Sequence, residues 1–316
     1  MRAAGVIRRW AAAIGAAGVV LTATTAVGVS GLLIRIEGPE DQRHPSADAS
    51  HLIWTQNSER RPLVDHAYGK VRGGEERFRL DPAGTRGAAG GIEPGGARAV
   101  YQQMTATTSD LYWFTFDTRT RRKIGFEGVN TDRWERDPRV STSFLLFARD
   151  ARNATTIHLW DRDARTVERI ARYDLERVYV APGAVGERFA TWTTCGPLTC
   201  TAWWYDTEAA DPAPAKLPSG GLPQYAPAID EVGGFVYAVR SGDACGESVG
   251  IWRRPWPLEP DQPAVRLVLL PGGIDTGYTS AVDRSPGDRV DLWFSRFRCA
   301  SDQGDVAVLR DVETGP

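Results

Sequence analysis

The stretch SPGDRVDLWFSR, residues 285–296, contains the clearest strand signal of the chain. It opens with Ser-Pro-Gly-Asp, a composition typical of a tight turn. Of the residues at 290–294 all but Asp291 are apolar or aromatic. The run is too short for a helix, so it predicts a strand. A second apolar run, DVAVLRD, follows at 305–311. The stretch therefore predicts two successive strands in a hairpin arrangement.

The same pattern recurs along the chain. Six short apolar runs end in an aromatic residue, and successive end residues lie 45 to 57 positions apart. These end residues are Trp54, Tyr101, Phe147, Trp192, Tyr237 and Phe294. After each run comes a turn and then a second apolar stretch. Hairpins that repeat at this period are typical of a propeller built from four-stranded blades. Residues 46–316 hold six such units, which predicts an all-β domain of about six blades.

The last unit also resembles a known family. SPGDRVDLWFSR resembles the S-P-D-G-K-x-I-A-F-x-S-x-R repeat of the TolB-like, WD40-like β-propellers, although the Asp-Gly turn is here Gly-Asp. DVAVLRDVETG, residues 305–315, resembles the third strand and the following turn of that repeat. The N-terminal α/β domain of TolB has no counterpart. The sixth unit ends before a fourth strand, so we expect residues 35–45, a linker or closing strand, to complete the ring; otherwise the chain is incomplete.

The N-terminal segment predicts export. Residues 1–9 are basic and form a cytoplasmic n-region, whereas residues 10–34 contain no charged side chain. As a helix this run would be about 37 Å long, enough to cross a membrane. We expect either an uncleaved transmembrane anchor or a signal peptide cleaved after Ala26 or Gly28. Arg8-Arg9 also allows a twin-arginine signal. The remainder would be extracytoplasmic, either membrane-anchored or secreted.

The cysteines agree with an oxidising compartment. There are four, all after residue 194, and their even number suggests two disulfides. Cys195 and Cys200 flank a short turn between two predicted strands of unit four. Cys245 and Cys299 occupy the corresponding turns of units five and six, so a second bridge would join those units. Spacing of the cysteines and histidines does not match a zinc site, and we expect no metal or cofactor.

Ser248 lies in GESVG, which matches the G-x-S-x-G pattern of a hydrolase nucleophile. A nucleophile elbow needs a helix after the serine. Here the chain continues IWRRPWPLEP, with three prolines that would break a helix. We therefore interpret Ser248 as a hairpin residue, and we expect no catalytic residue from this motif.

Four aspartates close the second stretch of their units: Asp117, Asp161, Asp206 and Asp311. Their recurrence at one position predicts a structural role, in which each carboxylate accepts backbone N–H groups of a turn. The Gly-rich segment 83–96 and the Pro-rich segments 211–227 and 253–263 are interpreted as loops at blade edges.

Charge and composition exclude one class of partner. Lys and Arg number 38 and Asp and Glu 40, so there is no basic excess for nucleic acid. The sequence favours a non-catalytic binding or scaffold propeller at the outer face of the membrane, with a protein or cell-envelope partner. The alternative is a propeller-type hydrolase, a glycosidase or lactonase, with carboxylates from several blades converging at the central channel.

Overall fold

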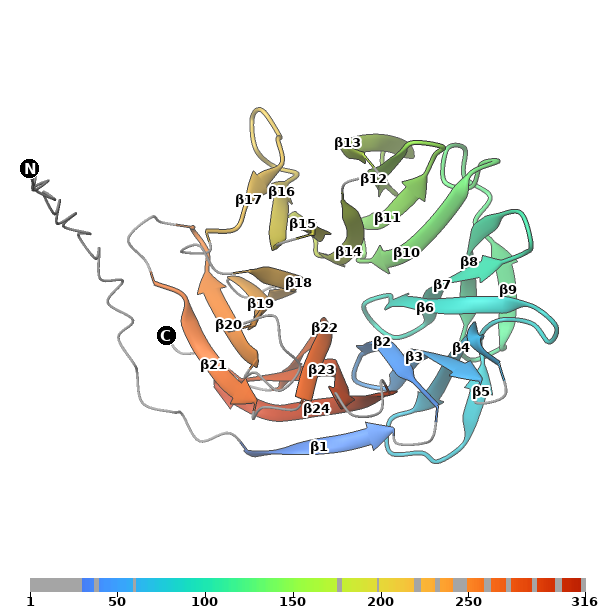
Figure 1. Ribbon diagram of the computed structural model, residues 1–316. Coiled ribbons are helices and arrows are strands. Elements are labelled where there is room, and N and C mark those ends of the chain that lie inside the picture. The colour runs from blue at the N-terminus through green and yellow to red at the C-terminus, as the bar shows by residue number, and fades with distance from the viewer. Residues whose placement is uncertain are drawn as a thin grey trace, which may run out of the picture.

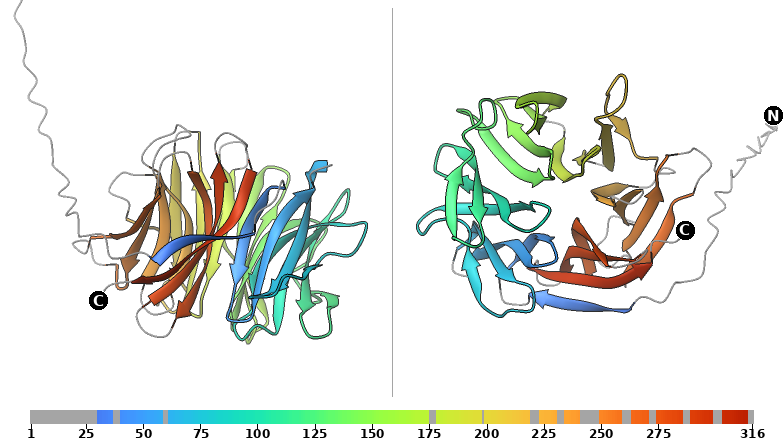
Figure 2. Two further views of the ribbon diagram at one scale, coloured as in Figure 1. Left: turned by 90° about the horizontal axis from the view of Figure 1, so that it is seen from below. Right: turned by 180° about the vertical axis from the view of Figure 1, so that it is seen from behind.

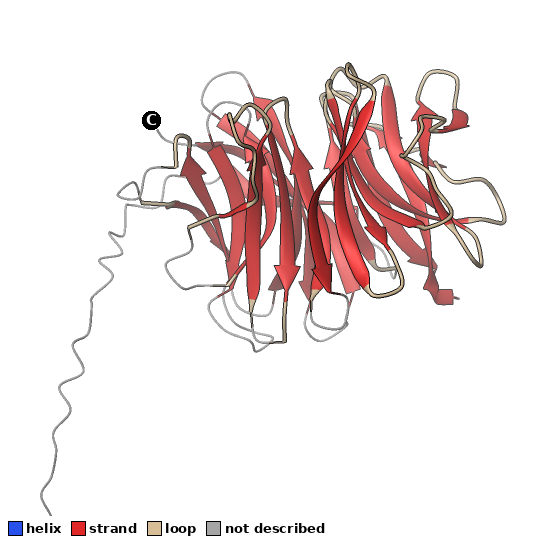
Figure 3. Ribbon diagram, turned by 90° about the horizontal axis from the view of Figure 1, so that it is seen from above, coloured by secondary structure: helices blue, strands red, loops and turns tan. Residues whose placement is uncertain are grey.

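The computed structural model describes residues 30–36, 40–58, 61–174, 178–197, 199–218, 223–230, 234–240, 249–258, 263–270, 274–285, 289–298 and 303–313. In these ranges the regular elements are strands, without a helix (Figure 3). The strands form a ring of six four-stranded antiparallel blades, a β-propeller (Figure 1). Seen from the side, the ring is a short disk whose strands run between its two faces (Figure 2).

Within each blade the strands follow one another from the axis outward. Blades 1 to 3 contain β2 (Gln42–Ala47), β3 (His51–Ser58), β4 (Arg61–Val71) and β5 (Arg77–Arg79); β6 (Arg86–Ile92), β7 (Arg98–Met104), β8 (Ser109–Thr115) and β9 (Thr120–Lys123); β10 (Trp134–Val140), β11 (Phe144–Asp150), β12 (Ala154–Asp161) and β13 (Thr166–Asp174). A single parallel bridge, between Ser109 and Trp134, joins blades 2 and 3.

Blades 4 to 6 repeat this order. They contain β14 (Tyr179–Val185), β15 (Phe189–Cys195), β16 (Cys200–Asp206) and β17 (Ala215–Lys216); β18 (Gln224–Asp230), β19 (Gly234–Arg240), β20 (Val249–Pro255) and β21 (Val265–Leu270); β22 (Ile274–Ser285), β23 (Arg289–Arg298), β24 (Gln303–Glu313) and, from the other end of the described chain, β1 (Ser30–Ile36).

The six aromatic residues that define the repeat occupy matched positions. Each lies in the second strand of its blade, in five blades as the fourth residue of that strand. All six are at most 2% exposed. Four of them face another ring on the third strand, in the pairs Trp54–Tyr68, Tyr101–Tyr112, Phe147–His158 and Trp192–Trp203. The prediction of equivalent sheets is confirmed.

Each blade buries its second strand against its neighbours. The cluster between blades 3 and 4, for example, joins Leu146 and Ile157 of one blade to Val180 and Trp192 of the next. Trp192 Nε1 also donates to Tyr173 Oη across this seam at 2.8 Å. Because a single blade is too thin to cover such side chains, the aromatics stabilise the ring only when neighbouring blades stack.

The strand β1 closes the ring. It pairs antiparallel with β24 from Ser30–Arg310 to Ile36–Val306 and forms the outer strand of blade 6. The closing strand thus begins earlier than the segment 35–45 considered for it, and it includes residues 30–34 of the run predicted as a membrane helix. Residues 1–29 lie outside the described part. In the described residues we find no helix long and apolar enough to cross a membrane.

The interpretation of segment 83–96 as an edge loop is wrong, because it contains β6, the innermost strand of blade 2. The Pro-rich segments likewise include the start of β18 and the end of β20. In the inner strands Pro and Gly are tolerated because these strands are bulged, with register shifts beside them.

Glycines of two inner strands lie against prolines of the next blade. Blades 1, 3 and 5 place Pro45, Pro138 and Pro227 on their inner strands, and blades 2 and 4 place Gly90 and Gly183. A Cβ added to Gly90 would lie 2.5 Å from the carbonyl oxygen of Pro138, and one added to Gly183 would lie 2.3 Å from that of Pro227. Each glycine therefore leaves room for the proline of the next blade.

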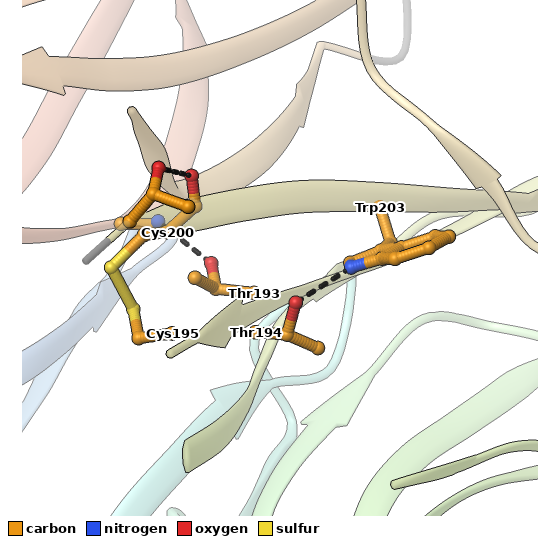
Figure 4. Close-up of a disulfide and its surroundings, with 7 residues drawn as sticks. Thr193, Thr194, Cys195, Cys200 and Trp203 are labelled. Carbon is orange, nitrogen blue, oxygen red and sulfur yellow. Dashed lines mark hydrogen bonds between the residues drawn. A yellow bond between two sulfur atoms is a disulfide. The ribbon is translucent and has the colours of Figure 1, made fainter. Parts of the chain in front are cut away.

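One of the two expected disulfides lies in the described chain. Cys195 and Cys200 are opposite each other at the ends of β15 and β16, with bonded sulfurs and a Cα–Cα distance of 4.0 Å (Figure 4). Beside it, Trp203 Nε1 donates to Thr194 Oγ1 at 2.8 Å. Such a bond fits an extracytoplasmic location. Cys245, Cys299 and Ser248 lie outside the described residues.

Candidate functional site

The bulges of the inner strands, which lie nearest to the axis, carry chemistry-bearing side chains. In β2, β10 and β18 the residue before the proline has a left-handed backbone: His44 at φ 51°, Asp137 at φ 52° and Ala226 at φ 50°. The left-handed region costs a non-glycine residue free energy, and bulges commonly redirect a side chain. Blade 5 has only a methyl group there, whereas blades 1 and 3 have an imidazole and a carboxylate.

Asp137 is held between arginines. Arg136 Nη1 lies 2.6 Å from its Oδ2, and the same atom donates to the carbonyl oxygen of Val180 at 2.8 Å. Arg136 also contacts Asp150 through Nε at 2.8 Å. Arg139 is 6% exposed and donates through Nε to the carbonyl oxygen of Gly183 at 3.0 Å. Both arginines therefore tie blade 3 to the inner strand of blade 4, and Arg136 fixes the carboxylate of Asp137.

His44 and Asp137 influence each other although they belong to blades 1 and 3. Burial is the main cause of the low pKa of His44, about 4; the Asp137 carboxylate opposes this shift, and Arg139 and Arg43 add to it. For Asp137, burial alone would raise the pKa, but Arg136, His44 and Arg139 outweigh it and lower the pKa below 3.8. At neutral pH the axis thus presents a neutral imidazole, a carboxylate and a guanidinium. We call His44, Asp137 and Arg139 the axial set.

A second buried imidazole behaves like His44. His158 is 8% exposed, its ring stacks on Phe147 at 5.3 Å, and its Nε2 lies 2.9 Å from Thr156 Oγ1. Burial, reinforced by Arg149 and Arg169, lowers its pKa to about 4. This histidine belongs to the core of blade 3 and not to the axial set.

These two histidines predict a loss of stability in mild acid. Their pKa is about 4 in the folded protein and about 6.5 in the unfolded chain. Between these values the unfolded chain binds more protons, so the free energy of unfolding falls as pH is lowered. Each site gives a slope of up to about 1.4 kcal/mol per pH unit. Urea unfolding from pH 7 to 4.5 measures it.

The variant His158→Asn separates the two sites. We expect it to reduce the proton uptake on unfolding by about one in this pH window. The carboxylates with lowered pKa, such as Asp137 and Asp206, lose their stabilising charge only at still lower pH. An unchanged slope in the variant would contradict the assignment of a neutral imidazole to the core.

A pocket of about 380 Å³ lies between blades 3 and 4 and is lined by five carboxylates, those of Asp161, Asp163, Glu168, Glu187 and Glu208. Several of them already have structural partners. Glu187 accepts the N–H groups of Thr142 and Ser143 at 2.8 and 3.2 Å, which links the two blades. These hydrogen bonds outweigh burial and lower the pKa of Glu187. The pocket thus contributes to the seam.

The repeated aspartates serve turns where the structure describes their bonds. Asp161 Oδ1 accepts the N–H groups of Asp163 and Ala164 at 2.9 and 2.8 Å. Asp206 Oδ1 accepts that of Glu208 at 3.0 Å, and both its oxygens contact Arg188. The structural role expected for these two residues is confirmed. Asp117 lies in the equivalent turn, and the side chain of Asp311 lies outside the described part.

Sequence reasoning missed the axial set. His44 and Asp137 lie in inner strands, QRHPSA and WERDPRV, that are short, polar and interrupted by proline. The one available signal was a polar residue directly before proline at matching places in two units. Among the described residues no three His, Cys, Asp or Glu side chains come together as a metal site requires.

Solved structures with a similar architecture include TolB proteins. TolB from Acinetobacter baumannii matches with a TM-score of 0.54 and 12% identity over 84% of this chain and 65% of that one. A protein assigned as TolB from Agrobacterium tumefaciens matches with a TM-score of 0.54 and 14% identity over 86% and 91%. The chain folds as a TolB-like β-propeller. It spans about two thirds of the Acinetobacter protein.

Enzymes share the same architecture. An oligogalacturonate lyase from Vibrio parahaemolyticus matches the propeller with a TM-score of 0.52 and 9% identity over 87% of this chain and 84% of that one. At such identities the likeness concerns the fold alone. No protein-family model matches the sequence, and no curated protein matches it.

Proposed function

We propose that the protein is an extracytoplasmic, non-catalytic propeller that binds an extended segment of a partner protein at the axis of its ring. The observation behind this proposal is the axial set. The bulge itself does not require polar side chains, since blade 5 forms it with Ala226. Blades 1 and 3 nevertheless place His44 and Asp137 there, close enough for each to shift the pKa of the other.

The chemistry of the axial set fits a peptide backbone. A backbone offers both N–H donors and C=O acceptors at every residue. Asp137 is an acceptor, Arg139 is a donor, and neutral His44 has one nitrogen of each kind. A histidine whose pKa is about 4 is a weak general base at neutral pH, which favours binding over acid–base catalysis.

The alternative, a propeller-type glycosidase or lactonase, makes a different prediction. Glycosidases use two carboxyl groups placed on either side of the scissile bond. The groups near Asp137 are guanidinium groups and an imidazole instead. The enzyme hypothesis therefore requires turnover of a glycoside or lactone that is abolished by Asp137→Asn, whereas the binding hypothesis requires capture of a partner without turnover.

Affinity capture tests the proposal. The immobilised wild-type protein is incubated with a detergent extract of the cells that produce it, beside the variants Asp137→Asn and His44→Asn. Asparagine suits these positions because it tolerates a left-handed backbone. The matched control is Asp132→Asn, whose side chain is 89% exposed and lies outside the bulge.

We expect a captured protein whose yield falls at least tenfold in both axial variants and is unchanged in the control, a difference of about 1.4 kcal/mol or more. A peptide from that protein should then bind the wild type in direct titration. Equal capture by all four proteins, each shown to be folded by its melting curve, would disprove an axial site.

A further inference from the structure

A second pocket, away from the axis, lies where the first and last blades meet. It has a volume of about 270 Å³ and is lined by Leu52 and Lys70 of blade 1, by the turn from Arg72 to Glu75, and by Trp293 and Arg310 of blade 6. Leu52 and Trp293 are 1% and 2% exposed and form its apolar floor. We call it the closure pocket, since the two ends of the chain's ring meet on either side of it.

Positive charge dominates its lining. Three side chains, Lys70, Arg72 and Arg310, are cationic, and Glu75 is the one acidic residue among the eight that line the pocket. The cations come from both blades. An anion between blades 1 and 6 would be attracted from both sides of the seam. In a partly buried place solvent ions screen this attraction only weakly.

Arg72 is held in place by contacts within the protein. Its Nη1 donates to the carbonyl oxygen of Asp48 at 2.5 Å, and its Nη2 lies 3.3 Å from Asp291 Oδ2 of blade 6. Its guanidinium carbon is 5.3 Å from the centre of the Trp293 ring. The next residue, Gly73, has φ 83°, which a glycine adopts without strain. The rim of the pocket is therefore preorganised around a fixed cation.

Trp293, which lines the floor, has a buried hydrogen-bond donor. Trp293 Nε1 is buried and has no hydrogen-bond partner among the described residues. The indole N–H can only donate, and a buried donor without an acceptor costs about 1–3 kcal/mol.

We propose that the closure pocket binds a phosphate-type oxyanion, as the free anion or as the phosphate of an ester. Lys70 and Arg310 supply charge from the two blades, Arg72 supplies a fixed guanidinium, and Trp293 lies in the floor. Charge-assisted hydrogen bonds of this kind are short and strong. An anion there contacts the first and last blades together, so its binding also holds the ring closed.

Calorimetric titration of the full chain tests the proposal. Inorganic phosphate and glycerol 3-phosphate are titrated separately at constant ionic strength, with chloride as the balancing anion. We expect one site per chain and a Kd about tenfold higher in Lys70→Gln and in Arg310→Gln. Arg152→Gln removes an exposed cation of blade 3 and should leave Kd unchanged. Melting curves show that each variant is folded.

The two titrants distinguish the sources of the anion. Tighter binding of inorganic phosphate supports a free anion, and tighter binding of the ester supports a phosphorylated ligand. A second readout is amide hydrogen exchange, which phosphate should slow at least threefold in β1 and β24 of the wild type only. The proposal is overturned if neither titrant binds saturably. It is also overturned if Lys70→Gln and Arg310→Gln bind the titrants with the same Kd as the wild type. The axial variants do not enter this test.

Discussion

A chain that begins at residue 37 is expected to be far less stable than a chain that begins at Ser30. The seven residues that differ form β1, the outer strand of blade 6. Its ladder with β24 has five paired positions, and at about 1 kcal/mol for each backbone partner its removal costs about 5 kcal/mol. Val306, Ala307 and Val308 of β24, now fully buried, would be covered by one strand fewer.

Urea unfolding of the two truncated proteins measures this difference. Both lack residues 1–29, so neither contains the segment expected to direct export. The chain from Ser30 should unfold at the same urea concentration as the full-length protein, whereas the chain from residue 37 should unfold at a much lower one. It should also aggregate at high concentration, because β24 becomes an exposed edge. Equal midpoints for the two truncations would show that β1 does not close the ring.

The repeat was predictable because a large aromatic side chain marks the same position in each unit. Trp54, Tyr101, Phe147 and Trp192 are far apart in sequence, yet burial between blades demands an aromatic at the same place each time. The position of the disulfide follows from the same frame, because Cys195 and Cys200 flank the turn between the second and third strands of one blade. Features that many blades share leave a periodic signal.

The closing strand and the axial set leave no such signal. The first five residues of β1, SGLLIRI, belong to the uncharged run, and short apolar segments do not reveal whether they form strand or helix. Its partner β24 lies some 270 residues away. The inner strands RGAAGGI and QYAPAID contain glycine and proline, residues that normally indicate loops. Only the packing of neighbouring blades around the axis explains why they are strands.

The close contact between glycine and proline of neighbouring inner strands predicts the other large effect. Gly90→Ala places a Cβ 2.5 Å from the carbonyl oxygen of Pro138 and 2.7 Å from that of Val100. Both are backbone atoms of neighbouring strands and cannot rotate away. The methyl group forces β6 and β10 apart, and overpacking of this kind costs about 3 kcal/mol. Gly183→Ala, which meets Pro227 in the same way, should lose a similar amount.

The matched control is Gly125→Ala, where a Cβ meets nothing within 4 Å and the backbone is not left-handed. Here alanine only restricts the unfolded chain, so the free energy of unfolding should rise by about 0.5 kcal/mol. One chemical change therefore has opposite signs at the axis and at the rim. If Gly90→Ala were as stable as the wild type, the inner strands would be free to separate. The close contact at Pro138, next to Asp137, would then not be a fixed part of the ring.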